Sequence, residues 1–294
     1  MEIKKVGVLG FGLMGSGIAQ VCAQAGIQTI AREIDQKYID NGFSIVEKNL
    51  SKAVKKEKIT QADKEAVLRN ISGTLELEDL KDCDLIIEAV IENLDLKNAM
   101  YSALDKICPE RTIFASNTSS LTVMSMAACT KRLDRFCGLH FFNPVPAMAL
   151  VEVVKTIATS KETVETAFRF AEKIGKTAVL AKDNSGFITN LLLVPYLLDA
   201  IRALEQGVAS TADIDLAMKL GCNHPMGPLT LLDFIGLDTI QNVGDVMFEE
   251  YKEKRYSAPP LLKKMVTAGF LGRKSGRGFY DYSTDKPVPT DLGI

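Results

Sequence analysis

The sequence predicts an α/β protein in which an open-sheet domain is followed by an all-helical C-terminal domain. Up to about residue 184, short apolar runs alternate with amphipathic segments, which is the pattern of βαβ units and of a sheet with both faces covered. Beyond the Asp-Asn-Ser-Gly turn at residues 183–186, apolar positions recur at helical spacing and strand patterns are nearly absent. We therefore expect one domain over residues 1–184 and a second over residues 185–294.

The period of the apolar residues places the elements of the first domain. Short apolar runs predict strands at Val6–Leu9, Gln28–Ala31, Leu85–Val90, Arg111–Ala115, Phe136–His140 and Leu150–Val154. Amphipathic segments predict helices at Met14–Ala25, Lys37–Lys58, Asp63–Leu68, Met100–Ile107 and Lys161–Ile174. Because strands alternate with helices, we expect parallel βαβ units.

The second domain is expected to consist of helices at Ile188–Leu204, Thr211–Leu220, Leu229–Tyr251 and Pro260–Gly269. A helical domain that is apolar on several faces is expected to bury one of them against a second copy of the chain. The sequence therefore predicts a homodimer formed through the C-terminal domain.

The charges are nearly balanced, with 35 lysine and arginine residues against 37 aspartate and glutamate residues. This balance creates no global field that would attract nucleic acid or a membrane surface. The apolar stretches are far shorter than the ~20 residues that span a bilayer, and the N-terminus MEIKKVGVLGFG lacks the layout of a targeting signal. Six cysteines without a CxxC pair favour buried thiols over disulfides or a metal site. We therefore expect a cytoplasmic protein with no metal, nucleic-acid or membrane partner.

A glycine motif follows the first expected strand and opens the first expected helix. The sequence GFGLMG fits G-x-G-x-x-G, in which the glycines permit a tight turn, a close approach of the backbone to a pyrophosphate and close packing of helix on strand. The free N–H groups at the helix N-terminus favour phosphate binding. We expect the backbone that binds a dinucleotide to comprise Gly10, Gly12, Leu13, Met14 and Gly15.

The acidic residue at the end of the second expected strand bears on the choice of dinucleotide. Glu33 follows Gly10 by about 20 residues, the spacing at which a carboxylate binds the ribose 2′-hydroxyl. Such a carboxylate repels a 2′-phosphate, so NAD is the expected cofactor. The neighbouring Arg32 could neutralise a 2′-phosphate, so NADP stays open as an alternative.

Eight segments in order along the chain resemble one enzyme family. They are Gly10–Gln20, Glu88–Leu94, Ser116–Leu121, His140–Pro144, Leu150–Val154, Gly186–Asn190, Ala217–Pro228 and Gly272–Tyr280. The chain is similar to the 3-hydroxyacyl-CoA dehydrogenases, and most similar to the short bacterial 3-hydroxybutyryl-CoA enzymes. The resemblance implies a Rossmann-like domain, a helical dimerising domain, and interconversion of (S)-3-hydroxyacyl-CoA with 3-ketoacyl-CoA by NAD(H).

The resemblance also implies roles for individual residues. It implies a catalytic set of His140, Glu152, Ser119 and Asn190, of which Ser119 and Asn190 also meet the substrate. It implies cofactor contacts by Glu92, Lys97, Ser119, Asn143 and Lys274, and CoA contacts by the segment that holds Ser51, Lys52, Lys56 and Lys58. The chain departs from the family pattern at Phe11, where a small residue is more typical, and at Glu33, where aspartate is usual.

The residue types suit the chemistry that the resemblance implies. Oxidation of a secondary alcohol needs a base with a pKa near the working pH, and histidine is the natural choice. His140 lies at the end of an expected strand, at the edge where open α/β sheets bind ligands. Glu152 alternates with apolar residues, so we expect it to be buried and to need a partner such as an imidazole N–H. His224, in a loop rich in glycine and proline, is the competing base.

Neutral and cationic side chains complete the expected site. Ser119 and Asn190 are donors for a developing oxyanion, and no G-x-S-x-G motif supports a hydrolase in which Ser119 is the nucleophile. Lys48, Lys52 and Lys55 share a helix face and form a local basic patch for CoA phosphates. Two alternatives remain: a dehydrogenase of free 3-hydroxy or sugar acids, and a catalytically silent dinucleotide-binding protein.

Overall fold

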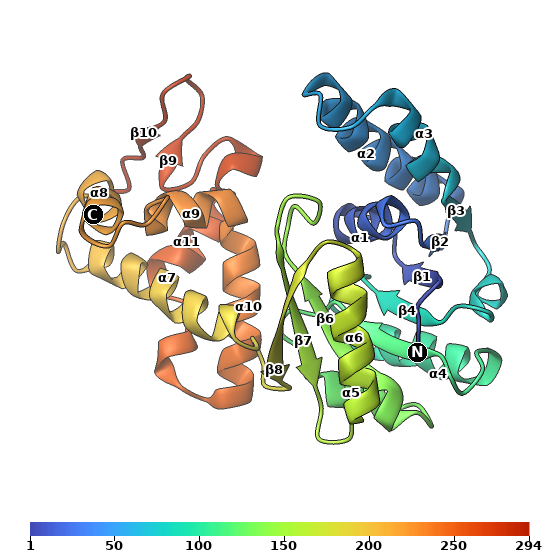
Figure 1. Cartoon of the computed structure of the whole chain (residues 1–294). Helices are drawn as coiled ribbons and strands as arrows, with labels where there is room; N and C mark the ends of the chain where they lie inside the picture. Colours follow the sequence, from blue (N-terminus) through green and yellow to red (C-terminus); the bar gives the residue numbers. More distant parts are fainter. Residues whose placement is uncertain (294) are drawn as a thin grey trace. The chain divides into compact units, whose positions relative to one another are not determined.

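The computed structural model describes residues 1–293 and divides the chain into two compact units, Met1–Phe187 and Ile188–Ile294 (Figure 1). The first unit is an open sheet covered by helices, and the second is built mainly from helices. The predicted fold class, a Rossmann-like domain followed by a helical domain, is confirmed.

The first unit contains an eight-stranded sheet with the order β3-β2-β1-β4-β5-β6-β7-β8. Its strands are β1 (Lys5–Leu9), β2 (Gln28–Arg32), β3 (Ile71–Thr74), β4 (Leu85–Glu88), β5 (Ile113–Ser116), β6 (Phe136–Phe141), β7 (Leu150–Lys155) and β8 (Thr177–Lys182). Its helices are α1 (Leu13–Gln24), α2 (Gln36–Lys55), α3 (Gln61–Arg69), α4 (Leu94–Ile107), α5 (Val123–Ala127) and α6 (Lys161–Lys173), with short 3₁₀ turns at Glu78–Leu80 and Leu133–Arg135. The strand order reverses between β1 and β4, which creates the crevice where such sheets bind ligands.

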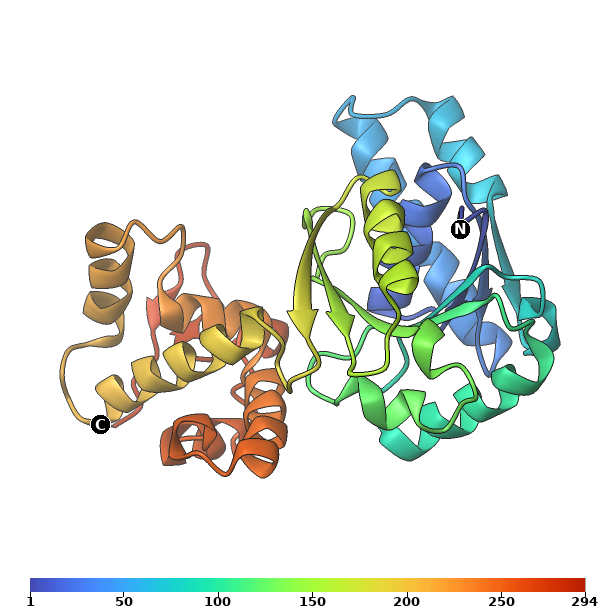
Figure 2. The ribbon, with the colours of Figure 1, turned by 60° about the horizontal axis from the view of Figure 1, so that its bottom comes forward.

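Two hydrophobic cores lie on the two faces of this sheet. Helices α1, α2, α3 and α6 bury residues such as Ile18 and Phe170 on one face, and α4 and α5 bury residues such as Tyr101 and Met126 on the other (Figure 2). Successive strand residues point to opposite faces, so Ile87 joins the first core and Ile86 the second. Burial of both faces explains why the inner strands read as continuous apolar runs.

The sheet is not parallel throughout, as the alternation of strands and helices had suggested. Strands β6 and β7 pair in antiparallel orientation, whereas the other neighbours run parallel. The physical reason is that a loop joins β6 to β7, and a parallel pair would need a crossover of a dozen or more residues. The antiparallel register sets His140 directly opposite Glu152.

The second unit packs its helices around its own core. They are α7 (Thr189–Glu205), α8 (Thr211–Gly221), α9 (Pro228–Ile235), α10 (Leu237–Tyr251) and α11 (Pro260–Thr267), with 3₁₀ turns at Lys254–Tyr256 and Arg273–Ser275 and a small hairpin of β9 (Tyr280–Asp281) and β10 (Val288–Pro289). The helix expected over Leu229–Tyr251 is two helices, because Gly236 lies between them at φ +107°. A positive φ cannot continue a right-handed helix, and glycine adopts it without steric cost.

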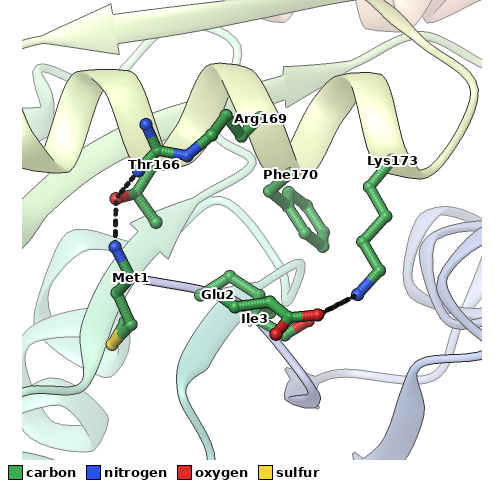
Figure 3. A pocket seen from close by; sticks show the side chains of 7 residues that line it. All are labelled: Met1, Glu2, Ile3, Thr166, Arg169, Phe170 and Lys173. Atoms are coloured by element: carbon green, nitrogen blue, oxygen red, sulfur yellow. Dashed lines mark hydrogen bonds and ion pairs between the residues drawn. The ribbon is translucent and has the colours of Figure 1, made fainter.

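A groove of about 400 Å³ lies between the residues before β1 and helix α6 (Figure 3). Ile3 and Phe170 line it, and Lys173 Nζ reaches a Glu2 carboxylate oxygen at 3.4 Å. Because Glu2 and Ile3 precede β1, the groove lies at the sheet edge opposite to the carboxyl ends of the parallel strands, where ligands bind. The candidate site is therefore elsewhere.

Residues 1–293 contain neither a membrane-spanning helix nor a cluster of metal ligands. None of the helices described there combines the length and the apolar character needed to cross a bilayer. No group of three or more His, Cys, Asp or Glu side chains in the same part of the chain could hold a metal ion.

Candidate active site

The glycine motif forms a tight turn at the β1/β4 crevice. Gly10 has φ +86°, and a Cβ built on it would lie 2.8 Å from the Ala89 carbonyl oxygen. A Cβ on Gly15 would lie 1.8 Å from the Gly10 carbonyl oxygen, so both positions need glycine for the chain's own packing. A Cβ on Gly12 would meet nothing within 4 Å. The space beside Gly12 is thus open to a ligand, as dinucleotide binding requires.

The first turn of α1 has free donors beside that space. Gly12 is the N-cap residue and provides no side-chain cap, and Leu13 and Met14 follow it as the first helical residues. Unpaired N–H groups and the positive end of the helix dipole favour a pyrophosphate at this position. The residues present therefore fit a dinucleotide.

Glu33 is connected to the glycine motif. The Phe11 N–H donates to Glu33 Oε1 at 2.6 Å, and the Ile34 N–H donates to Oε2 at 3.2 Å. The carboxylate stands beside the glycine loop, where it would repel a 2′-phosphate. Arg32 donates from Nε to the Leu75 carbonyl oxygen at 3.2 Å. The guanidinium group that could have neutralised the 2′-phosphate of NADP therefore binds the backbone.

Phe11, the departure between the first two glycines, is completely buried. Its ring contacts Phe43 edge-on with centroids 5.2 Å apart, and a Cβ on Gly42 would lie only 2.1 Å from it. The large side chain therefore packs against α2, in the hydrophobic core, and Gly42 makes room for it.

His140 and Glu152 form a buried pair across strands β6 and β7. His140 Nδ1 lies 2.6 Å from Glu152 Oε2, and the two residues are 5% and 0% exposed. The rings of Phe142 and Phe187 lie 4.5 and 5.5 Å from the imidazole, centroid to centroid. An apolar surrounding strengthens the hydrogen bond and fixes the ring, so Nε2 is the nitrogen left for chemistry.

The loop that carries Ser119 follows β5, the strand next to β6. Asn117 Oδ1 accepts the Phe141 N–H at 2.9 Å, which joins the start of the loop to the residue after His140. On either side of Ser119, the hydroxyls of Thr118 and Ser120 donate to Glu92 Oε1, the latter at 3.2 Å. Ser119 itself is half-buried. The structure therefore brings Ser119, Glu92 and His140 to neighbouring strand ends.

Lys97 is buried to 1% side-chain exposure between two carboxylates. Its Nζ lies 2.5 Å from Glu92 Oε2 and 3.1 Å from Glu88 Oε1. Burial raises the pKa of Glu88, and the nearby Lys97 only partly offsets this. Burial also raises the pKa of Glu92, but the pull of Lys97 and of the two hydroxyls outweighs it, so that pKa lies below its ordinary value. Sequence reasoning missed Glu88, although a carboxylate ending an apolar strand was a signal.

The loop after His140 holds Asn143, whose side chain is exposed. Lys176, a 9% exposed residue, donates from Nζ to the carbonyl oxygens of Val145 and Met148 at 2.6 and 2.7 Å. Desolvation lowers the pKa of Lys176. The backbone that carries Asn143 is therefore held in place from the start of β8.

Asn190, Lys274 and His224 belong to the second unit. Asn190 lies in the first turn of α7, and Lys274 Nζ pairs with Asp238 at 2.5 Å. His224 Nδ1 lies 3.2 Å from the Tyr196 hydroxyl, within the same unit. The roles of Asn190 and Lys274 in the site stay predictions.

The basic segment is shorter as a helix than the sequence suggested. Helix α2 ends at Lys55, Glu57 adopts φ +54°, and Lys58 lies beyond the helix. Lys52 and Lys56 are exposed, whereas the Ser51 hydroxyl accepts from Lys64 Nζ at 3.0 Å. The exposed ammonium groups around the end of α2 remain available to a phosphate.

Known proteins resemble the chain over nearly its whole length. Residues 5–184 match the family model described as 3-hydroxyacyl-CoA dehydrogenase, NAD binding domain, and residues 186–282 match the model of the C-terminal domain. A Bacillus subtilis protein named probable 3-hydroxybutyryl-CoA dehydrogenase is 47% identical over 282 residues, covering 96% of this chain and 98% of the relative. Human mitochondrial hydroxyacyl-coenzyme A dehydrogenase is 46% identical, covering 95% of this chain and 91% of the relative.

A solved structure gives the same result. The crystal structure of (S)-3-hydroxybutyryl-CoA dehydrogenase from Ralstonia eutropha matches with a TM-score of 0.92 and 44% identity, covering 96% of this chain and 100% of that chain. The predictions of family and cofactor are confirmed by these matches, and the open space beside Gly12 agrees with them. The chain belongs to the 3-hydroxyacyl-CoA dehydrogenase family and is an NAD-dependent oxidoreductase.

Proposed function

We propose that the protein interconverts (S)-3-hydroxybutyryl-CoA, or a similarly short 3-hydroxyacyl-CoA, and acetoacetyl-CoA, with His140 as general acid and base. The observation that carries the proposal is the buried His140–Glu152 pair at the end of β6, on the edge of the sheet that also carries the glycine motif. The names of the relatives, 3-hydroxybutyryl-CoA dehydrogenases of 44 to 47% identity, support the substrate.

The pair supplies the proton chemistry of alcohol oxidation. Bound NAD(H) supplies the hydride acceptor or donor. In oxidation, Nε2 of His140 takes the proton of the substrate hydroxyl, while a hydride leaves the carbon atom that bears this hydroxyl. Glu152 accepts from Nδ1, which keeps Nε2 unprotonated beforehand and stabilises the imidazolium afterwards. In reduction, the imidazolium returns its proton to the carbonyl oxygen.

The neutral donors stabilise the reacting oxygen. Ser119 is proposed to donate its hydroxyl to the carbonyl oxygen, where negative charge develops during reduction, and Asn190 to do the same from α7. The hydrogen bonds from the Thr118 and Ser120 hydroxyls to Glu92 support this role of Ser119, because a preorganised donor needs a fixed backbone.

Lysines near the end of α2 are proposed to bind the CoA phosphates. Changing Lys52 and Lys56 together to glutamate is expected to raise the KM for acetoacetyl-CoA on the order of tenfold, because repulsion replaces attraction at a cost of about 1.4 kcal/mol. The KM for NADH should stay within about twofold. The matched control is Lys263→Glu with Lys264→Glu on α11, which makes the same charge change on another exposed helix. An unchanged acyl-CoA KM would remove this part of the proposal.

An assay of acceptors and cofactors tests the reaction. Ketoacyl-CoA substrates of increasing chain length, and free acetoacetate, are offered with NADH and with NADPH. The expected pattern is fastest turnover with acetoacetyl-CoA and NADH. Preference for free acetoacetate would identify the free-acid dehydrogenase, and NADH binding without turnover of any acceptor would identify a silent dinucleotide-binding protein.

We also propose a cytoplasmic homodimer formed through the second unit. On α8, Leu216 and Leu220 are 51% and 77% exposed at i, i+4 spacing, and Phe234 on the adjacent α9 is 50% exposed. Such an apolar surface is typical of a protein interface. The six cysteines are all free thiols, which suits a reducing compartment. Sedimentation that shows a stable monomer at micromolar concentration would contradict the dimer.

A further inference from the structure

The cluster of Glu88, Lys97 and Glu92 lies at the carboxyl end of β4, beside the loop that carries Ser119. Two carboxylates share one ammonium group, and Glu88 and Lys97 are 0% and 1% exposed. A carboxylate is rarely buried so completely unless its oxygens are paired. Both oxygens of Glu88 are paired: Oε1 accepts from Val90 N–H at 2.8 Å and from Lys97, and Oε2 accepts from the Ser116 hydroxyl at 2.7 Å.

The contacts continue without a break from Glu88 to both sides of Ser119. Ser116 Oγ, bound to Glu88, accepts the Thr118 N–H at 3.1 Å. Lys97, bound to Glu88, binds Glu92, which accepts from the hydroxyls of Thr118 and Ser120. One route therefore reaches the loop through a hydroxyl and the other through an ion pair.

Lys97 has little freedom to meet a ligand. Its ammonium group lies between two carboxylates, and 1% of its side chain is exposed, against 35% for Glu92. Its charge offsets the burial of Glu88 only in part, but together with the two hydroxyls it outweighs the burial of Glu92. Glu92 can therefore stay ionised and accept two hydroxyls at once, which a protonated carboxyl would do poorly.

We propose that Glu88 is a positioning residue for Ser119: it holds Lys97 and Ser116, and through them Glu92 and the loop from Asn117 to Leu121. This inference rests on the proposed role of Ser119 in the reaction. It also gives Lys97 a part in the same support. Glu88 acts at a distance, because its own oxygens are occupied by the protein.

The test is a double-mutant cycle between Glu88→Gln and Ser119→Ala. An amide has one acceptor oxygen where the carboxylate has two and carries no charge, so either Ser116 or the pair of Val90 and Lys97 loses its acceptor. Glu88→Gln is expected to lower kcat for acetoacetyl-CoA roughly tenfold and to change the Kd for NADH less than about threefold. In the Ser119→Ala background the same change should lower kcat less than about twofold, because the group being positioned is gone.

A matched control separates positioning from general damage. Asp105→Asn also turns a carboxylate of low side-chain exposure, 9%, into an amide, and it breaks the ion pair with Arg132 at 2.6 Å. Arg132 also donates from Nη1 to the carbonyl oxygens of Pro109 and Thr112, which precede β5, so this ion pair lies at the opposite edge of the sheet. Asp105→Asn should lower the melting temperature, leave kcat unchanged and combine additively with Ser119→Ala. The inference would be overturned if Glu88→Gln lowered kcat by the same factor with and without Ser119→Ala. It would also be overturned if Glu88→Gln kept the wild-type kcat.

A readout without substrate separates this inference from the proposed function. Hydrogen exchange of the backbone N–H groups of residues 117–121 should speed up in Glu88→Gln and stay at the wild-type rate in Asp105→Asn. If the wild-type enzyme fails to reduce acetoacetyl-CoA but the exchange result holds, the proposed function is wrong and the support of the loop stands. Unchanged exchange in Glu88→Gln would contradict the support itself.

Discussion

Replacing His140 by glutamine is expected to lower kcat for acetoacetyl-CoA reduction by about 10³-fold, within the range of general acid–base catalysis. Glutamine has a comparable size and can still donate to Glu152 Oε2, which His140 Nδ1 meets at 2.6 Å. It has no group that titrates near neutral pH, so no proton reaches the carbonyl oxygen from this position. The measurement is steady-state kinetics together with NADH binding followed by fluorescence.

The expected signature is a loss in kcat with a nearly unchanged Kd for NADH. The glycine motif that holds the dinucleotide belongs to β1 and α1, whereas His140 lies in β6. His224→Gln is the matched control, because it makes the same change at the other histidine and removes a contact with Tyr196. Turnover near the wild-type value in His140→Gln, or an equal loss in His224→Gln, would contradict the assignment.

Changing Gly12 to valine is expected to raise the Kd for NADH on the order of 100-fold, or about 2.8 kcal/mol. Valine would fill the space through which the pyrophosphate approaches the backbone. The fold has room for its Cβ, which would meet no atom within 4 Å, and φ of −72° suits a residue other than glycine. The melting temperature without cofactor should therefore stay close to the wild-type value, and calorimetric titration with NADH measures the affinity.

Gly15→Ala provides the contrast within the same motif. Its Cβ would lie 1.8 Å from the Gly10 carbonyl oxygen, so this variant should lose stability before any ligand is added. Overpacking of this kind typically costs about 1 to 3 kcal/mol. Tight NADH binding by Gly12→Val would show that the cofactor does not pass this glycine, and a melting temperature as low as that of Gly15→Ala would show that the space is not open.

Much of the fold could be predicted because its signals are local. Buried strands such as β4 and β5 are apolar runs, and amphipathic helices show their period directly. Strand β3 could not, because Ile-Ser-Gly-Thr contains one large apolar residue and gains its place by pairing with β2. Strand β8 could not be predicted either. It lies at the edge of the sheet with one neighbouring strand, and most of its side chains are exposed or half-buried, so its apolar residues show no clear strand pattern.

The site residues also differ in whether their contacts could be predicted from local sequence signals. The alternation around Glu152 indicated a buried carboxylate, but its position opposite His140 depends on the antiparallel register of β6 and β7, a long-range property. The ion pairs of Lys97 could not be predicted, because its two carboxylate partners meet it only when α4 packs beside β4. Charge in a sequence does not reveal whether it is already neutralised in the fold.

The most direct measurement of the central claim is the rate of NADH oxidation with acetoacetyl-CoA as the only acceptor, compared with free acetoacetate and with identification of the product. The expected result is formation of 3-hydroxybutyryl-CoA in equal amount to the NADH consumed, with a kcat/KM at least about 100-fold above that for acetoacetate, because binding energy from the CoA group is used in the transition state. Equal kcat/KM for the two acceptors, or no NADH oxidation with acetoacetyl-CoA, would contradict the account.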